Sequence, residues 1–410
     1  MTGDAGRGAG LVPGRDGGRI YLFAYLLLSV LLVWQIVASA MASGLETRAP
    51  EQARRWRAGQ PEALLSLAQD ALNDQDLRRA NRYAVKALTI SPSLGVAYRI
   101  LGQAAERSGD HEGADRLYAQ AYSLTHRDAA LASILFEKAA AAGRYDEALQ
   151  QAEVIIRRAP PQTGVVIAKL AGLASNPRSG PAMGRRLAEN PHWRPAFFRE
   201  LGRRGDYATA LTLYEALQPT RSPATDEELS PILNRMVWSG QADAARAAWI
   251  KTLPARRRPG ASEIYNPNFQ APAGRQMFDW RLPDDRGGLA RLPAAGEKPG
   301  LHVQVEGLGE AHLAHQLLVL APGRYVLTSR ARLVDGAGVD LQWRLGCGAI
   351  LGEPLTLSLS SPGAVEGRIE LDLPRPCNAD LNLHALERDR GDPVLAVVET
   401  VRLQRPGSAP

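Results

Sequence analysis

A spacing of 34 residues recurs in the first half of the chain, and no other sequence feature restricts its fold so strongly. Segments that start at Pro61, Gly95 and Ala129 carry matching residues at fixed positions. Position 20 is alanine and position 7 is leucine in each segment: Ala80, Ala114 and Ala148, with Leu67, Leu101 and Leu135. Alanine lets two antiparallel helices approach closely. One helix pair cannot bury its apolar face alone, so the spacing predicts a stack of helix pairs.

The turns between the predicted helices carry a second signal. Residues 109–114 read Gly-Asp-His-Glu-Gly-Ala and residues 143–148 read Gly-Arg-Tyr-Asp-Glu-Ala. Glycine permits the left-handed backbone that such a turn requires. With the 34-residue register, this pattern resembles the tetratricopeptide repeat family. The pattern weakens over residues 163–190, returns near Pro191 and again near Asp226, and ends near Pro254.

The resemblance implies a protein-binding groove on the concave side of the stack. In this family the groove is lined by fixed repeat positions. Here those positions include Arg99, Gln103, Glu106, Arg107, Ser133 and Glu137. Their mixed character names no particular ligand. A purely architectural role, which only spaces the last domain from a membrane, is an open alternative.

An apolar stretch precedes the repeats. No charged residue occurs from Ile20 to Leu45, and residues 20–42 are long enough to cross a hydrocarbon core of about 30 Å. We expect an uncleaved transmembrane helix, because the apolar core is longer than that of a typical signal peptide. A cleaved signal peptide is the alternative, since Ala38-Ser39-Ala40 resembles a cleavage site. Arginines flank both ends, so charge does not decide the orientation.

After Ser262 the period of the apolar residues changes to two. Examples are Leu301, Val303 and Val305, then Leu341, Trp343 and Leu345, then Leu355, Leu357 and Leu359. Turn dipeptides separate the stretches, most clearly Pro322-Gly323 and Asp335-Gly336. Seven or eight short strands at such spacing predict a β-sandwich or jelly roll. Trp343 and Tyr325 share the parity of their apolar neighbours, which favours the core for both.

Three short motifs resemble carbohydrate-binding jelly rolls of galactose-binding-like fold. They are Asn266-Pro267-Asn268-Phe269, Phe278-Asp279-Trp280 and Pro322-Gly323-Arg324-Tyr325. The resemblance implies polysaccharide as a ligand. Trp280 is the candidate platform, with Asp279 and Arg281 as its polar neighbours. The alternative is that Trp280 packs beneath the sheet.

The chain has 2 cysteines, Cys347 and Cys377, and both fall in the predicted sandwich. A disulfide between them would close a loop of about 30 residues and would persist only in an oxidising compartment. Two buried thiols are the alternative. With the apolar stretch, the pair favours a body that faces the periplasm.

Motifs for catalysis and for cofactors are missing from the sequence. It contains no GxSxG, phosphate-loop or HExxH pattern, and His312 and His315 are the only closely spaced histidines. We therefore expect no cofactor and no metal. The 49 basic and 43 acidic residues nearly balance, so nucleic acid is not an expected partner.

The expected domains follow from these patterns. They are a cytoplasmic tail at 1–19, a membrane span at 20–42, a linker or first helix at 43–60, helical repeats at 61–254, a linker at 255–263, a β-sandwich at 264–405 and a disordered tail at 406–410. We expect a non-catalytic scaffold of the bacterial inner membrane with a single span and a periplasmic body. It would bind a protein partner in an envelope or exopolysaccharide assembly complex. The alternative is a polysaccharide-acting enzyme with its site on the sandwich.

Overall fold

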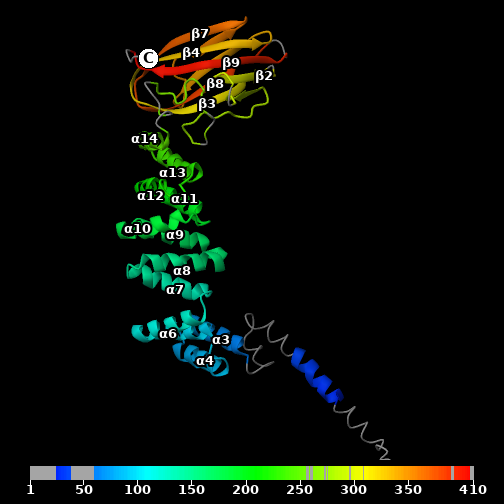
Figure 1. Cartoon of the computed structure of the whole chain (residues 1–410), viewed down its shortest axis with the longest axis vertical. Coiled ribbons are helices and arrows are strands. Elements are labelled where there is room, and N and C mark those ends of the chain that lie inside the picture. Colours follow the sequence, from blue (N-terminus) through cyan, green and yellow to red (C-terminus); the bar gives the residue numbers. More distant parts are fainter. Residues whose placement is uncertain are drawn as a thin grey trace, which may run out of the picture. The chain divides into compact units, whose positions relative to one another are not determined.

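The computed structural model divides into two compact units, Met1–Thr163 and Gly164–Pro410 (Figure 1). It describes residues 25–37, 60–254, 258, 262–271, 274, 276–294, 297–307, 309–388 and 392–406. The predicted cytoplasmic tail, both ends of the predicted membrane span and residues 43–59 lie outside these residues. So do most of the predicted basic linker and residues 407–410.

Helix pairs make up most of the first unit. They are α3 (Pro61–Asn73) with α4 (Leu77–Ile90), α5 (Gly95–Arg107) with α6 (His111–Leu124), and α7 (Ala129–Ala141) with α8 (Tyr145–Arg158). The first helices of the three pairs start at the three predicted positions, which confirms the 34-residue register. Ala80, Ala114 and Ala148 are all fully buried, as expected for residues where paired helices touch.

The turns within the pairs repeat the same backbone geometry. Gln75, Gly109 and Gly143 all have a left-handed backbone, with φ of 63°, 90° and 73°. Glycine adopts this conformation without a steric cost, whereas glutamine does not. Asp76 and Asp110 then cap the second helix of their pairs by accepting a hydrogen bond from a backbone N–H three residues on.

The second unit begins with further helices. They are α9 (Thr163–Ala174), which starts at the unit boundary, α10 (Gly180–Ala188), α11 (Arg194–Arg204), α12 (Tyr207–Leu217), α13 (Asp226–Trp238) and α14 (Ala242–Thr252). Short 3₁₀ turns, η1 (Pro160–Gln162) and η2 (Pro177–Ser179), interrupt the region where the repeat pattern weakens. A fully buried ion pair, Arg194 Nε to Glu228 Oε1 at 2.7 Å, joins α11 to α13.

Two sheets form the C-terminal sandwich, as the alternation predicts. The strands are β1 (Gly288–Arg291), β2 (Leu301–Val305), β3 (Ala311–Leu320), β4 (Gly323–Asp335), β5 (Val339–Gly346), β6 (Leu355–Leu359), β7 (Gly363–Leu373), β8 (Cys377–Ala385) and β9 (Val394–Gln404). The five-stranded sheet has the order β1-β2-β9-β4-β7, and the four-stranded sheet has the order β3-β8-β5-β6. Their apolar faces enclose one core that contains Tyr325 and Trp343.

A disulfide joins Cys347 to Cys377, with the two Cα atoms 6.0 Å apart. Cys347 follows β5 and Cys377 begins β8, so the bond lies at one end of the four-stranded sheet. The described chain has no free cysteine.

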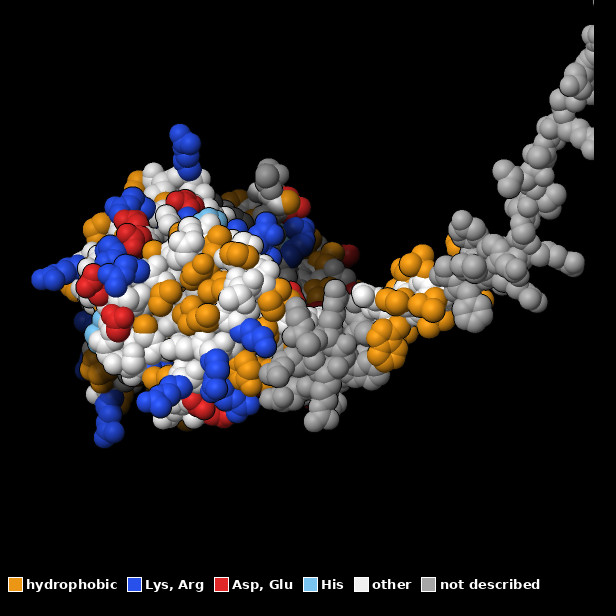
Figure 2. Space-filling view, turned by 90° about the horizontal axis from the view of Figure 1, so that it is seen from below, with side chains coloured by type: hydrophobic (Ala, Val, Ile, Leu, Met, Phe, Trp, Pro, Cys, Tyr) orange, Lys and Arg blue, Asp and Glu red, His pale blue; other side chains and the backbone are white. Residues whose placement is uncertain are grey.

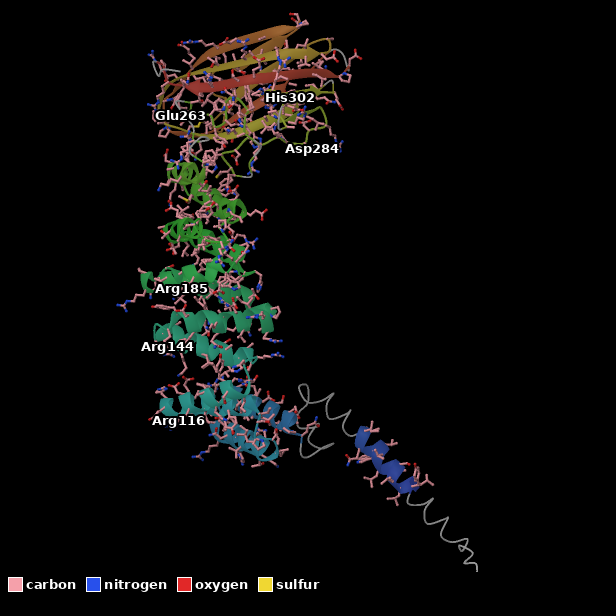
Figure 3. All side chains as sticks on the ribbon, viewed as in Figure 1. Arg116, Arg144, Arg185, Glu263, Asp284 and His302 are labelled. Carbon is pink, nitrogen blue, oxygen red and sulfur yellow. A yellow bond between two sulfur atoms is a disulfide. The ribbon has the colours of Figure 1, made fainter. Side chains whose placement is uncertain are left out.

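Within the second unit the last helices pack on the sandwich. The Trp249 ring of α14 lies 4.8 Å from the ring of Tyr265 and 5.3 Å from that of Phe278. The buried Gln276 side chain accepts a hydrogen bond from Ser230 Oγ and donates one to the Asp226 carbonyl, each at 2.9 Å. Figure 3 labels Glu263, whose carboxylate lies 3.4 Å from Arg246 of α14.

The described part of the predicted membrane span, residues 25–37, is helical, and every residue in it is exposed. Figure 2 shows this helix as a cluster of hydrophobic side chains next to residues drawn in grey. Among the helices that the structure describes, none has both the length and the apolar character needed to cross a membrane.

Candidate functional site

The residues predicted to line the solenoid groove form a polar network across the repeats. Arg99 is only 8% exposed. Its Nε donates to Asp128 at 2.8 Å, and its Nη1 donates to Gln69 at 3.1 Å and to Gln103 at 2.9 Å. One guanidinium thus connects side chains of the first and second repeats with Asp128, the N-cap of the helix that opens the third. Asp128 also caps α7, so the pair fixes where the third repeat begins.

Glu106 lies at a second joint of this network. It accepts hydrogen bonds from Tyr118 Oη and from Lys138 Nζ, both at 2.8 Å. Burial alone would raise the pKa of Glu106, but the hydrogen bonds from Lys138 and Tyr118 outweigh it and lower that pKa. The pKa of Tyr118 is raised, first by burial and then by its bond to Glu106. Tyr118 therefore acts as a neutral donor to a carboxylate.

The other predicted groove residues also make contacts within the chain. Arg107 Nη1 donates to the Leu72 carbonyl of the first repeat. Ser133 Oγ donates to the Ala129 carbonyl at 2.9 Å, and Glu137 is exposed and has an interaction partner. Arg99, Glu106 and Arg107 therefore join one repeat to another, whereas Gln103 and Ser133 bond within their own helices. Their role in binding a partner stays a prediction.

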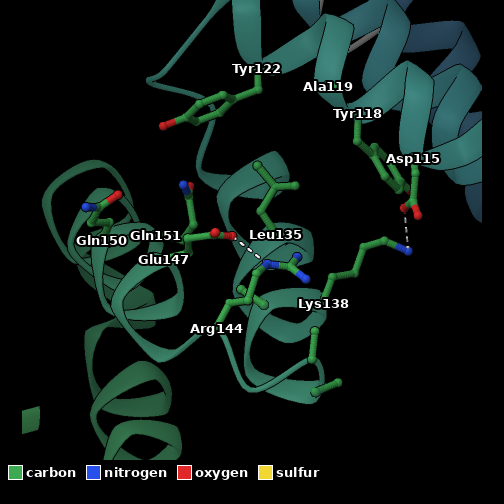
Figure 4. A pocket seen from close by; sticks show the side chains of 13 residues that line it. Asp115, Tyr118, Ala119, Tyr122, Leu135, Lys138, Arg144, Glu147, Gln150 and Gln151 are labelled. Carbon is green, nitrogen blue, oxygen red and sulfur yellow. Dashed lines mark hydrogen bonds and ion pairs between the residues drawn. The ribbon is translucent and has the colours of Figure 1, made fainter. Parts of the chain in front are cut away.

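A hollow of about 810 Å³ is bounded by α6, α7 and α8, and Tyr118 and Lys138, the two partners of Glu106, are among its lining residues (Figure 4). One wall is aromatic and aliphatic and includes Tyr122 of α6 and Leu135 of α7. Charged pairs lie around it. Lys138 Nζ is 3.0 Å from Asp115, and Arg144 Nε is 2.8 Å from Glu147. The hollow thus combines an apolar surface with charges of both signs.

Gln150 and Gln151 supply the amide groups of the hollow. Gln151 is 7% exposed, and its side chain lines the hollow. Since an amide both donates and accepts, Gln151 can pair with the backbone of a bound peptide.

Sequence reasoning did not find Tyr122, Leu135 or Gln151 as site residues. Their repeat positions differ from those that the family resemblance assigns to the groove. The sequence did offer one indication at Tyr122. This aromatic residue lies on a face of its helix that the alanine pattern does not predict to be buried. Its ring contacts His126 edge-on, with the centroids 4.5 Å apart.

Trp280, the predicted sugar platform, lies in the core of the sandwich. It is 2% exposed, its Nε1 donates to the Asn266 carbonyl at 3.2 Å, and its ring packs against Phe269 and Trp343. Asp279 is also buried and accepts a hydrogen bond from the Gln276 backbone N–H at 2.9 Å. In this structure a ligand cannot reach either side chain. Arg281 is exposed, and its backbone pairs with His315.

Three histidines meet on the outer face of the four-stranded sheet. His312 and His315 of β3 lie with ring centroids 5.3 Å apart, and His384 of β8 stacks on His312 at 4.9 Å. His384 Nδ1 is 2.8 Å from Glu310, which also pairs with Arg344. Among the described residues no group of three metal-ligating side chains is placed to hold a metal ion. The sequence showed the first two histidines together, but only the β3–β8 register adds the third.

Comparison with known proteins gives structural matches only. No family model matches the chain, and no curated protein matches it.

Among solved structures, the helical region is similar to YrrB, a TPR protein with an unusual peptide-binding site. The two are 13% identical over 49% of this chain and 89% of the other, with a TM-score of 0.27. PilF of Pseudomonas aeruginosa is 18% identical over 47% of this chain and 89% of its own, with a TM-score of 0.28. The sandwich is similar to TmCBM61, solved in complex with β-1,4-galactotriose, at 13% identity over 36% of this chain and 99% of the other, with a TM-score of 0.26. At such low identities and TM-scores, these similarities say nothing about what this chain binds.

Proposed function

We propose that the chain is a non-catalytic binding scaffold whose helical repeats hold an extended segment of a partner protein in the hollow between α6, α7 and α8. The observation that carries the proposal is that one hollow combines an apolar wall, Tyr122 and Leu135, with the side-chain amides of Gln150 and Gln151. These amides offer donors and acceptors to a peptide backbone. A hollow of about 810 Å³ has room for several residues of an extended chain.

The walls define the side chains that would fit. Tyr122 and Leu135 form an apolar contact surface, and a tyrosine at the centre of an interface often contributes strongly to affinity. The ion pairs Lys138–Asp115 and Arg144–Glu147 lie at the rim, where charges govern orientation more than affinity. We therefore expect a segment with an apolar residue flanked by polar residues of either charge.

A random-peptide display library selected on the full chain tests the proposal. Clones that bind should lose affinity about tenfold or more in Tyr122→Ala and in Gln151→Leu, measured by fluorescence polarisation. Gln120→Ala is the matched control, because Gln120 is exposed on α6 but does not line the hollow. If every selected clone binds Tyr122→Ala as tightly as the unaltered chain, the hollow is not the binding site.

The compartment is part of the same proposal. The disulfide between Cys347 and Cys377 suits an oxidising compartment, and the exposed apolar helix at residues 25–37 suits attachment to a membrane. We propose a single span at residues 20–42 with the body in the bacterial periplasm, in an envelope or exopolysaccharide assembly complex. Titration of free thiols in the non-reduced protein checks the compartment: none is expected, and two would contradict it.

A further inference from the structure

Trp238 is the most exposed large hydrophobic side chain in the described part of the chain, at 85% exposure. It ends α13, and the backbone around it is held in place. The Ser239 N–H bonds to the Arg235 carbonyl at 2.9 Å, and Tyr207 Oη lies 3.3 Å from both that carbonyl and Ser239 Oγ. A single exposed aromatic residue needs no explanation, but one that is continuous with an apolar hollow forms a patch of the kind that marks an interaction site.

An apolar hollow of about 710 Å³ lies on one side of Trp238, between α13 and the sandwich. Its apolar lining residues are Val237, Met277, Leu282, Pro283 and Leu317. Its polar lining residues are Arg281 and, from the four-stranded sheet, His315, Asn378 and Asp380. Tryptophan and methionine together are typical of the centres of protein interfaces.

A basic hollow of about 540 Å³ lies beside the same tryptophan, between α11 and α13. It is lined by three exposed arginines, Arg199, Arg203 and Arg235. Arg203 is bound to Glu200 through two hydrogen bonds of 2.6 and 2.7 Å. Neither Arg199 nor Arg235 has an ion pair with any described residue. The guanidinium groups of Arg199 and Arg235, which line this hollow beside Trp238, can therefore pair with carboxylates of a ligand.

We infer that this surface, which we call the Trp238 surface, binds an acidic segment of a protein partner. An apolar side chain of the segment enters the 710 Å³ hollow beside Trp238, and its carboxylates meet Arg199 and Arg235. Charge complementarity decides the occupant. The larger hollow is lined by both Arg281 and Asp380, whereas the smaller one is lined by arginines and by no acidic residue of the described chain, so the carboxylates of the segment face α11 and α13. A saccharide is disfavoured by the predominance of aliphatic side chains in the larger hollow.

The Trp238 surface and the hollow in the first unit share no lining residue, so one experiment can test them separately. Two display libraries are selected on the full chain, one with two fixed glutamates beside a fixed phenylalanine and one with lysines in place of the glutamates. The glutamate library should be enriched and the lysine library should not. Binding of the enriched clones should fall about tenfold or more in Trp238→Ala, and should weaken and lose salt dependence in the double variant Arg199→Gln, Arg235→Gln.

Matched controls use the same unit. Ile350→Ala removes another exposed apolar side chain, and Arg178→Gln removes another exposed arginine; both should bind as the unaltered chain does. Tyr122→Ala should also leave these clones unaffected. The inference is overturned if the glutamate library is not enriched, if its clones bind Trp238→Ala unchanged, or if an oligogalacturonide or a neutral glucan oligomer displaces them.

Discussion

Gln75 occupies a backbone position that glycine holds in the next two repeats. Its φ of 63° is left-handed, and the equivalent Gly109 has open space where a side chain would begin. A non-glycine residue costs about 1–2 kcal/mol there, partly offset by the entropy that glycine loses on folding. Gln75→Gly should therefore raise the free energy of unfolding by about 0.5–1 kcal/mol, measured by urea denaturation. The reciprocal variant Gly109→Gln should lower it, and a loss of stability in Gln75→Gly would contradict the account.

Arg194 and Glu228 form a fully buried ion pair. Arg194 also donates to the carbonyls of Leu187 and Ser222, and Glu228 closes the capping box of α13 with Thr225. Arg194→Met would leave Glu228 charged and buried. We expect a loss of about 3–5 kcal/mol in the unfolding transition of the second unit. Arg203→Met, which removes an arginine from an exposed pair, should have a much smaller effect on stability, because solvent screens that pair. Equal effects would contradict the role of burial.

The burial of a residue could be predicted from the sequence where its neighbours in space are also close to it in the chain. The alanines at position 20 are predictable because the helix pair that buries them is continuous in the chain. Trp280 is different: its burial depends on Phe269, on Trp343 of β5 and on the Asn266 carbonyl, which only the folded sandwich brings together. Its neighbours in the sequence, Asp279 and Arg281, gave the opposite impression.

The histidines of β3 and β8 make the four-stranded sheet sensitive to acid. The pKa of His315 is lowered by burial and then by His312, and that of His384 by burial and then by Arg344. Asp380 and Glu310 act in the opposite direction but do not reverse the shifts. The unfolded chain, with histidine pKa near 6.5, therefore binds protons first as the pH falls. The stability that depends on these two neutral histidines is therefore fully present above about pH 6.5 and declines as the pH falls below it.

The double variant His315→Gln, His384→Gln should lose less stability than the unaltered chain as the pH falls below about 6.5. Thermal melting of the second unit, recorded between pH 7.5 and pH 5, measures this, because histidine titrates within that range. His192→Gln serves as the control, since His192 is exposed on another element. Parallel curves for the double variant and the unaltered chain would show that these histidines do not cause the loss.

Secondary structure elements were predictable where one side of the element is buried. The alternation of Leu355, Leu357 and Leu359 marks β6, and the same rule marks β2 and β5. The order of strands in the sheets was not predictable, because pairings such as β2 with β9 join distant segments. The register shift between His312 and Ala314 belongs to the pairing of β3 with β8, which places His312 opposite His384.

At the scale of the whole molecule, the change from helices to strands does not coincide with the unit boundary. The composition changes at residues 255–263, but the compact units meet at Thr163 and Gly164. Trp249 accounts for part of this difference, because it is 1% exposed between α14, Tyr265 and Phe278. A sequence cannot reveal that a repeat helix buries its aromatic residue against a later domain.

Trp249→Ala should uncouple the last helices from the sandwich. Loss of a buried tryptophan costs about 3–5 kcal/mol, and here the loss falls on the packing between two kinds of structure. Calorimetry of residues 164–410 should show one transition for the unaltered unit and two for the variant. Trp238→Ala should retain one transition, since Trp238 is exposed. A single, unshifted transition in Trp249→Ala would contradict the coupling.

Hydrogen exchange of the full chain, with and without a peptide selected on it, tests the central claim of a binding hollow most directly. For a clone whose affinity depends on Tyr122, we predict slower exchange in the second half of α6 and in the α7–α8 turn, with α3 and α4 unchanged. Protection confined to α3 and α5, the side of the predicted groove, would contradict the proposed hollow.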